Sequence, residues 1–280
     1  MKFHYINHKG ERINFYEFPY LFQEGDLINW TYAYDSENEN EIELYKKTKE
    51  FKVKIAVMPD NSLPYEERYE QYIEGINRLH DVLNQDAALS KEGKLYADDG
   101  SHIKCIFFES DKIEWKTATP LMYIQFHVVA KNPDWITEIS KSFKPNAGTD
   151  PAALDYPHDY PYDYAPQILS ENIVNDNYAD ADFRLTIYGP AVNPSVTIGP
   201  NIYKVYTELS ETDYLVIDTQ EQIVAQYDNV GVETNKFNSR EKIYEIYAKI
   251  PPGIHGVYWP GGYGFDVTMY QKRSEPRWNS

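Results

Sequence analysis

Residues 144–166 read KPNAGTDPAALDYPHDYPYDYAP, and this stretch divides the sequence into two parts of different character. It contains five prolines and repeats an Asp-Tyr-Pro unit at Asp155–Pro157 and Asp159–Pro161. A proline lacks a backbone donor and disfavours a helical conformation in the residue before it, so neither a helix nor a central strand can cross this stretch. We therefore predict a stiff, extended linker between two domains, residues 1–143 and 167–280. A long loop inside a single domain is the alternative.

Composition favours a folded protein that is rich in β structure. A chain of 280 residues can form two cores, and its aromatic content of 15%, with 26 tyrosines, is typical of half-buried strands. The net charge of −17 argues against sequence-specific nucleic acid binding, because such proteins need clustered Lys and Arg to displace counterions.

The single cysteine and the apolar runs bear on the compartment. Cys105 lies in the apolar run Ile103–Phe108, where we interpret it as a small core residue; no intrachain disulfide can form, as fits a reducing cytosol. No apolar run reaches the roughly 20 residues of a membrane helix, so we expect no membrane insertion.

The first predicted domain combines strands with one long helix. Residues 64–86 carry apolar side chains at helical spacing behind a first-turn proline, and His80 falls on the apolar side as a core residue. Leu27–Tyr34 alternates as a strand, and a protruding hairpin is predicted from about Leu27 to Met58. Met1–Phe15 reads as another hairpin that turns at Lys9-Gly10. Further strands are expected at residues 93–97, 102–109 and 122–130.

The second predicted domain is a series of short strands separated by Gly, Pro and Asn turns, the pattern of a β-sandwich or barrel. The expected strands are 168–174, 183–188, 195–198, 202–209, 214–218, 223–227, 243–248 and 265–271. Overall the fold class is mainly β: an N-terminal β-rich domain with one long helix and a protruding hairpin, followed by a β-sandwich.

No motif in the sequence identifies a catalytic site. Phosphate-binding loops, dinucleotide fingerprints, nucleophile elbows and zinc-protease helices are all missing, so we expect no catalytic residues, no cofactor and no metal site. Tyr258, Trp259 and Tyr263 are candidate glycan contacts, because aromatic rings stack on sugars. The alternative is aromatic packing within the sandwich, which a buried Trp259 would favour. A glycan hydrolase ranks last, since no carboxylate spacing predicts one.

Several stretches together resemble the distal tail (Dit) protein family of phages with long, non-contractile tails. At the C-terminus these are Lys249–Gly253, Gly264–Thr268 and Arg273–Trp278; earlier in the second part they are Ile187–Pro194 and Asn235–Arg240. The Asp-Tyr-Pro segment also looks similar, as do Gly25–Tyr34 and Phe126–Trp135. These pieces are spread over nearly the whole chain. The resemblance rests on their order along it.

The resemblance implies a structural role at the tip of a phage or prophage tail. Such proteins form a ring, usually a hexamer, through the N-terminal domain, and a galectin-like C-terminal sandwich projects outward. The implied partners are the tail tube protein and a tail-associated, fibre or receptor-binding protein. The implied location is the virion tail tip, after assembly in the bacterial cytoplasm. The competing hypothesis is a glycan-binding adhesion module that contacts the host cell wall through the sandwich.

Overall fold

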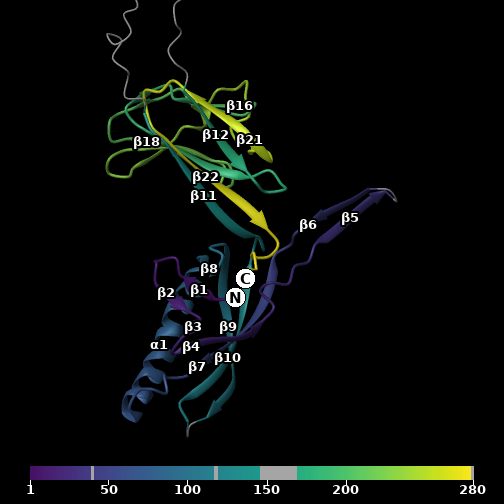
Figure 1. Ribbon diagram of the computed structural model, residues 1–280, viewed down its shortest axis with the longest axis vertical. Coiled ribbons are helices and arrows are strands. Elements are labelled where there is room, and N and C mark those ends of the chain that lie inside the picture. Colours follow the sequence, from purple (N-terminus) through teal and green to yellow (C-terminus); the bar gives the residue numbers. More distant parts are fainter. Residues whose placement is uncertain (39–40, 117–118, 146–168, 279–280) are drawn as a thin grey trace, which may run out of the picture. The chain divides into compact units, whose positions relative to one another are not determined.

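The computed structural model describes residues 1–38, 41–116, 119–145 and 169–278 (Figure 1). These residues form two compact units, one made of the described residues up to Thr137 and from Arg273 onward, and the other of those between Glu138 and Lys272. The chain passes between the units at the junctions 137/138 and 272/273. The predicted linker lies, from residue 146 onward, outside the described residues, so the domain boundaries drawn from the sequence stay a prediction.

The first unit is built on antiparallel strands around one apolar core. The opening hairpin is confirmed, because Tyr5 of β1 lies opposite Ile13 of β2 on one side and Leu95 of β8 on the other. A second run of strands has the order β9-β10-β7-β4-β3. The strands are β1 (Phe3–Ile6), β2 (Arg12–Asn14), β3 (Tyr16–Glu17), β4 (Tyr20–Gly25), β7 (Lys49–Val57), β8 (Gly93–Ala97), β9 (His102–Lys116) and β10 (Leu121–Ala130).

The long helix α1 (Tyr65–Leu89) covers the apolar face of these strands. It begins after Pro64, as predicted, and continues three residues beyond the expected end, until Ser90 takes a left-handed conformation with φ of 52°. Leu79, Val82 and Leu83 are buried against the strands. Tyr69 also falls at the helical spacing of the apolar residues. It is half exposed instead, because it lies beside the face of the helix that packs against the strands.

The predicted strand Leu27–Tyr34 and the hairpin from Leu27 to Met58 are wrong in their bounds. The chain turns after Asp26, whose carboxylate accepts the Lys52 backbone N–H at 2.6 Å, and Leu27 is buried as an anchor. The hairpin contains only β5 (Ala33–Asn38) and β6 (Glu41–Tyr45), while β7 joins the main strands between β4 and β10. Buried Val53 and Ile55 explain why β7 belongs to the core rather than to the hairpin.

The second unit is the predicted β-sandwich, with its core between two groups of strands. One group has the order β20-β19-β18-β13-β22-β11 and the other β12-β21-β15-β16. Their inward residues, such as Leu185, Val257 and Val267, are fully buried. The strands are β11 (Trp135–Phe143), β12 (Leu169–Asn175), β13 (Asp182–Tyr188), β14 (Ala191–Val192), β15 (Ser195–Ile198), β16 (Asn201–Lys204), β17 (Glu208–Leu209), β18 (Tyr214–Asp218), β19 (Ile223–Tyr227), β20 (Glu233–Asn235), β21 (Gly253–Trp259) and β22 (Phe265–Arg273).

The strand predicted at Ile243–Ala248 is wrong. Turn hydrogen bonds form there instead, such as that from the Ala248 N–H to the Glu245 carbonyl at 3.2 Å, and Ile243 is 82% exposed. The strand in this part of the chain is instead β21 (Gly253–Trp259), which begins directly after Pro251 and Pro252. Within the described residues no helix combines the length and the apolar character needed to cross a membrane.

Candidate functional site

The structure separates the three candidate glycan contacts. Trp259 is 3% exposed and its ring packs edge-on against Phe143 and Phe265, at centroid distances of 5.7 and 5.2 Å. Tyr263 is also buried; its hydroxyl donates to the Ser195 carbonyl and accepts the Ser195 N–H, both at 2.7 Å. Burial raises the pKa of Tyr263 to about 12. These two rings belong to the sandwich core. This arrangement favours the alternative in which the aromatic residues pack within the sandwich.

Tyr258 alone presents its ring to solvent. It is 44% exposed and, one residue before Trp259 on β21, faces the opposite side of the strand. Its ring lies over Gly256, where an added Cβ would come within 2.9 Å of the ring carbons. The glycan contact therefore stays a prediction that rests on this one side chain.

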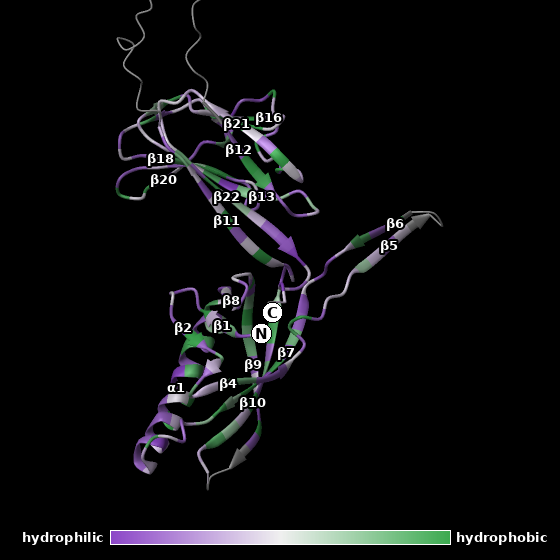
Figure 2. Ribbon diagram, in the orientation of Figure 1, coloured by the Kyte–Doolittle hydropathy of each residue, from purple (hydrophilic) through white to green (hydrophobic). Residues whose placement is uncertain are grey.

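The β5–β6 hairpin, which extends away from the other strands of the first unit in Figure 1, carries exposed apolar side chains, and part of β6 has the hydrophobic colour in Figure 2. Tyr34 lies directly opposite Leu44, and Ile42 shares their face because it precedes Leu44 by two residues. These side chains are 68%, 61% and 69% exposed. We call this surface, made of Tyr34, Ile42 and Leu44, the hairpin face.

Electrostatics does not stabilise the hairpin from within. Asp35 lies opposite Glu43 on its other side, and like charges at directly opposed positions repel. Among the described residues, β5 and β6 pair only with each other. A two-stranded hairpin is at best marginally stable in water, and a contiguous exposed apolar surface marks an interaction site.

Polar contacts hold the base of the hairpin. The Tyr32 hydroxyl lies 3.0 Å from the Ser274 hydroxyl, and the Lys46 ammonium donates to Asp134 at 2.5 Å. Lys46 also lies 5.1 Å from the centre of the Tyr32 ring, a cation–π contact. The hairpin therefore leaves the unit from a fixed base.

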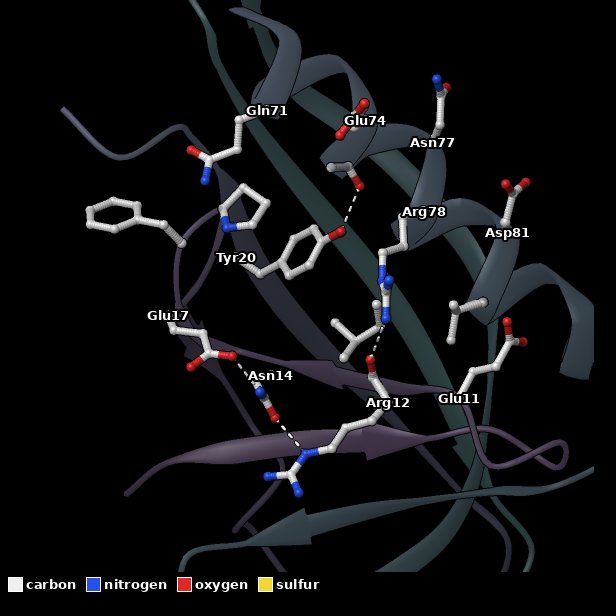
Figure 3. A pocket seen from close by; sticks show the side chains of 15 residues that line it. Glu11, Arg12, Asn14, Glu17, Tyr20, Gln71, Glu74, Asn77, Arg78 and Asp81 are labelled. Atoms are coloured by element: carbon white, nitrogen blue, oxygen red, sulfur yellow. Dashed lines mark hydrogen bonds between the residues drawn. The ribbon is translucent and has the colours of Figure 1, made fainter. Parts of the chain in front are cut away.

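A surface hollow of about 680 Å³ lies between α1 and the segment from Glu11 to Tyr20 (Figure 3). The Tyr20 hydroxyl points across it and donates to the Gly75 carbonyl at 2.9 Å, and Arg78 donates to the Arg12 carbonyl at 3.3 Å. Asn14 accepts from the Arg12 side chain. Because these groups satisfy one another, and the lining holds no nucleophile beside a base, the hollow offers no catalytic arrangement.

The cysteine and the helix histidine have core roles, as predicted. Cys105 is fully buried, and burial raises the pKa of its thiol, so the reactive thiolate is disfavoured. His80 is partly buried with its ring 6.1 Å from that of Phe126, and burial lowers its pKa. Neither position favours nucleophilic or ligand chemistry.

Comparisons with known proteins show likeness in structure rather than in sequence. No family model matches the chain, and no curated protein matches it in sequence. Among solved structures, the Dit protein of phage SPP1 is described as a paradigm of the hub adsorption apparatus in phages that infect Gram-positive bacteria. It superposes with a TM-score of 0.56 at 8% identity, over 97% of this chain and 99% of that one. The chain adopts the Dit fold.

Two baseplate structures show the same fold. A chain of the phage P2 baseplate, in its activated conformation with Ca, has a TM-score of 0.60 at 10% identity, over 98% of this chain and 99% of that one. A chain of the phage p2 baseplate with Sr has a TM-score of 0.57 at 12% identity, with the same coverage. The resemblance inferred from scattered sequence pieces is therefore confirmed at the level of the fold. The sequence did not predict the hairpin face as a functional surface. The structure shows it as part of a chain with this Dit fold.

Proposed function

We propose that this protein is the structural hub of a phage or prophage tail tip. Copies of the chain, six by the family resemblance, form a ring that joins the tail tube protein to tail-associated or fibre proteins. It acts as a structural component of the virion tail rather than as an enzyme, and it assembles in the bacterial cytoplasm. The Dit fold supports this role, since the solved structures that share it include a hub protein and chains of phage baseplates.

The proposal of a ring rests on one observation, the exposed hairpin face. A hairpin that has an apolar face and a repelling charged pair, and that pairs with no third strand among the residues the structure describes, is stabilised when another surface covers it. In a ring, the neighbouring copy supplies that surface, and every copy both offers and receives a hairpin. Such a head-to-tail contact closes into a ring when the rotation between neighbours divides a full turn.

Covering the hairpin face provides a substantial share of the association energy. Full burial of one large apolar side chain is worth about 1.5–3 kcal/mol. Because Tyr34, Ile42 and Leu44 are between 61% and 69% exposed, each retains roughly two-thirds of that amount, or about 1–2 kcal/mol. The three together contribute about 3–6 kcal/mol per hairpin, which corresponds to at least a hundredfold in affinity.

The net charge fits a conduit for DNA. With −17 charges per chain, acidic residues on the inner wall of the ring would repel the phosphate backbone, so that DNA slides through without binding. A structure of the assembled ring tests this part of the proposal, and a channel lined by Lys and Arg would contradict it.

Replacing the hairpin face tests the ring. The triple variant Tyr34→Ser, Ile42→Ser and Leu44→Ser should remain folded, because these side chains are exposed in the single chain, yet stay monomeric in light scattering. The control is Val230→Ser, which removes an equally exposed apolar side chain (76%) from a turn of the second unit. A triple variant that assembles as fully as the wild type would refute the role of the hairpin.

Glycan binding by the sandwich is the second candidate function. The exposed ring of Tyr258 above the glycine of β21 is the observation that favours it. Loss of cell-wall glycan binding in Tyr258→Ala, with binding retained in Tyr178→Ala at another exposed tyrosine of the same unit, would support this function.

A further inference from the structure

The face of the central strands that points away from α1 carries a histidine surrounded by carboxylates. His127 lies on β10, between Glu50 on β7 and Glu109 and Asp111 on β9. The strand register explains the cluster, since His127 is opposite Glu109 and Gln125 is opposite Asp111. A register shift next to His127 turns this part of β9 so that both carboxylates flank the imidazole.

The geometry around His127 is close. Its Nδ1 lies 2.6 Å from a Glu50 carboxylate oxygen and 3.9 Å from one of Glu109, and its Nε2 lies 3.8 Å from one of Asp111. One donor atom each from Glu109, Asp111 and His127 lie within 4.8 Å of one another. The imidazole is 13% exposed, whereas the three carboxylates are exposed by half or slightly more. The ring is thus held in place while the carboxylates are free to adjust.

We propose that His127, Glu109 and Asp111 bind a divalent transition-metal cation, with Zn²⁺ as the best match. In the tautomer that carries its proton on Nδ1, His127 donates to Glu50 and the lone pair of Nε2, 3.8 Å from Asp111, ligates the ion. Glu109, now 3.9 Å from Nδ1, turns toward Nε2 to join it. A carboxylate that orients the far nitrogen of a ligating histidine is a recurrent feature of zinc sites. Water completes the coordination, as in other zinc sites with three protein ligands.

Only small movements separate the present arrangement from a site filled by metal. Donor atoms of a tetrahedral zinc site are about 3.4 Å apart, given bond lengths near 2.1 Å. The donor atoms lie within 4.8 Å of one another and must therefore approach by up to about 1.4 Å. Rotation of the exposed Glu109 and Asp111 side chains provides this while His127 remains in place. Imidazole favours Zn²⁺ over Ca²⁺, which takes six to eight oxygen ligands.

Charge also favours a cation at this position. Three carboxylates lie close to the His127 imidazole, whereas Lys52, directly opposite His127 on β7, brings one positive charge to the same face, so the carboxylates outnumber it. Lys54, on the same face, lies 3.3 Å from Glu24 and serves another carboxylate. A bound ion would connect β7, β9 and β10 and stabilise the folded first unit by mass action. The site is independent of ring formation and departs from the sequence-based expectation that the chain has no metal site.

Titration of the full chain with Zn²⁺ tests the proposal. The protein is prepared without a polyhistidine tag, stripped with a chelator and dialysed, and binding is followed by calorimetry and by the melting temperature. We expect one saturable Zn²⁺ site per chain and a rise in melting temperature that the chelator reverses, with no such effect from Ca²⁺. No saturable binding up to millimolar Zn²⁺ would overturn the proposal.

Variants locate the ion. His127→Gln, or Asp111→Asn combined with Glu109→Gln, should abolish the saturable site, and Glu50→Gln should weaken it about tenfold to a hundredfold through loss of histidine orientation. The carboxylate double variant serves if His127→Gln fails to fold. The matched control is Glu24→Gln on the neighbouring strand, which should bind as the wild type does. Unchanged binding in the double variant would place the ion elsewhere and refute the site.

Discussion

Replacing Asp86 by alanine should destabilise the first unit more than any surface substitution. The carboxylate is fully buried near the end of α1, where it accepts hydrogen bonds from the Tyr5 hydroxyl, from His8 Nδ1 and, at 3.1 Å, from the His8 backbone N–H. It thereby connects the helix with the opening hairpin. Burial and the neighbouring negative groups raise the pKa of Tyr5, so its hydroxyl remains a donor.

The cost follows from the partners that lose their acceptor. Each buried donor left unsatisfied costs about 1–3 kcal/mol. Because His8 is partly exposed and water can replace one contact, we expect a total loss of about 3–5 kcal/mol. With a urea m-value near the upper end for small proteins, about 3 kcal/mol/M, the unfolding midpoint should fall by about 1–1.7 M.

The assay is equilibrium unfolding in urea, with Asp86→Ala compared to the wild type. Asp81→Ala, at an exposed position of the same helix, is the control and should change the free energy of unfolding by no more than about 0.5 kcal/mol. Tyr5→Phe removes one of the three donors and should cost about 1 kcal/mol. A loss below about 1 kcal/mol in Asp86→Ala would show that water or local rearrangement satisfies these donors, and the reasoning would fail.

Three further predictions follow from other parts of the chain. Burial opposes ionisation of Asp182, but Lys272 at 2.6 Å and Lys249 at 3.2 Å hold its pKa below the usual value. Asp182→Asn should therefore lower the stability of the protein at pH 7. In thermal melts, the difference in melting temperature between variant and wild type should vanish as the pH falls from about 5 through that lowered pKa. Trp259→Ala should destabilise the sandwich by about 3–5 kcal/mol in urea unfolding, and a near-neutral effect would contradict its core position. Cleavage between Pro151 and Pro161 should leave the two fragments associated in size-exclusion chromatography, because Phe143 stacks on Phe265 at 4.6 Å; their separation into two folded halves would instead support a linker between domains.

Local sequence signals predicted the elements whose patterns are self-contained. The helix at 65–89 has a first-turn proline and a regular apolar stripe, and strands such as β8 and β18 are short alternating runs between turns. These features depend on neighbouring residues alone, so a single sequence is sufficient to find them. The likeness in fold to hub proteins could also be predicted from the sequence, because several short stretches, none of them specific alone, occur in the expected order along the chain.

Features that depend on pairing between distant strands were not accessible. Alternation in Leu27–Tyr34 looked like a strand, but the Asp26–Lys52 contact turns the chain there. The pattern around Tyr258–Tyr263 could not show which ring faces the core, because this depends on the register of β21 with β12 and β15. The carboxylates around His127 come from the preceding strand β9 and from β7, which is distant in sequence, and only the register and its shift bring them together.

The central claim is that copies of this chain assemble into a hub ring. The most direct measurement is negative-stain microscopy of the purified wild-type protein at high concentration, with light scattering for the mass. The account predicts closed rings with a central hole and a mass near six chains of 32.7 kDa. A protein that remains monomeric at high concentration, and also when mixed with the tail tube protein, would contradict it.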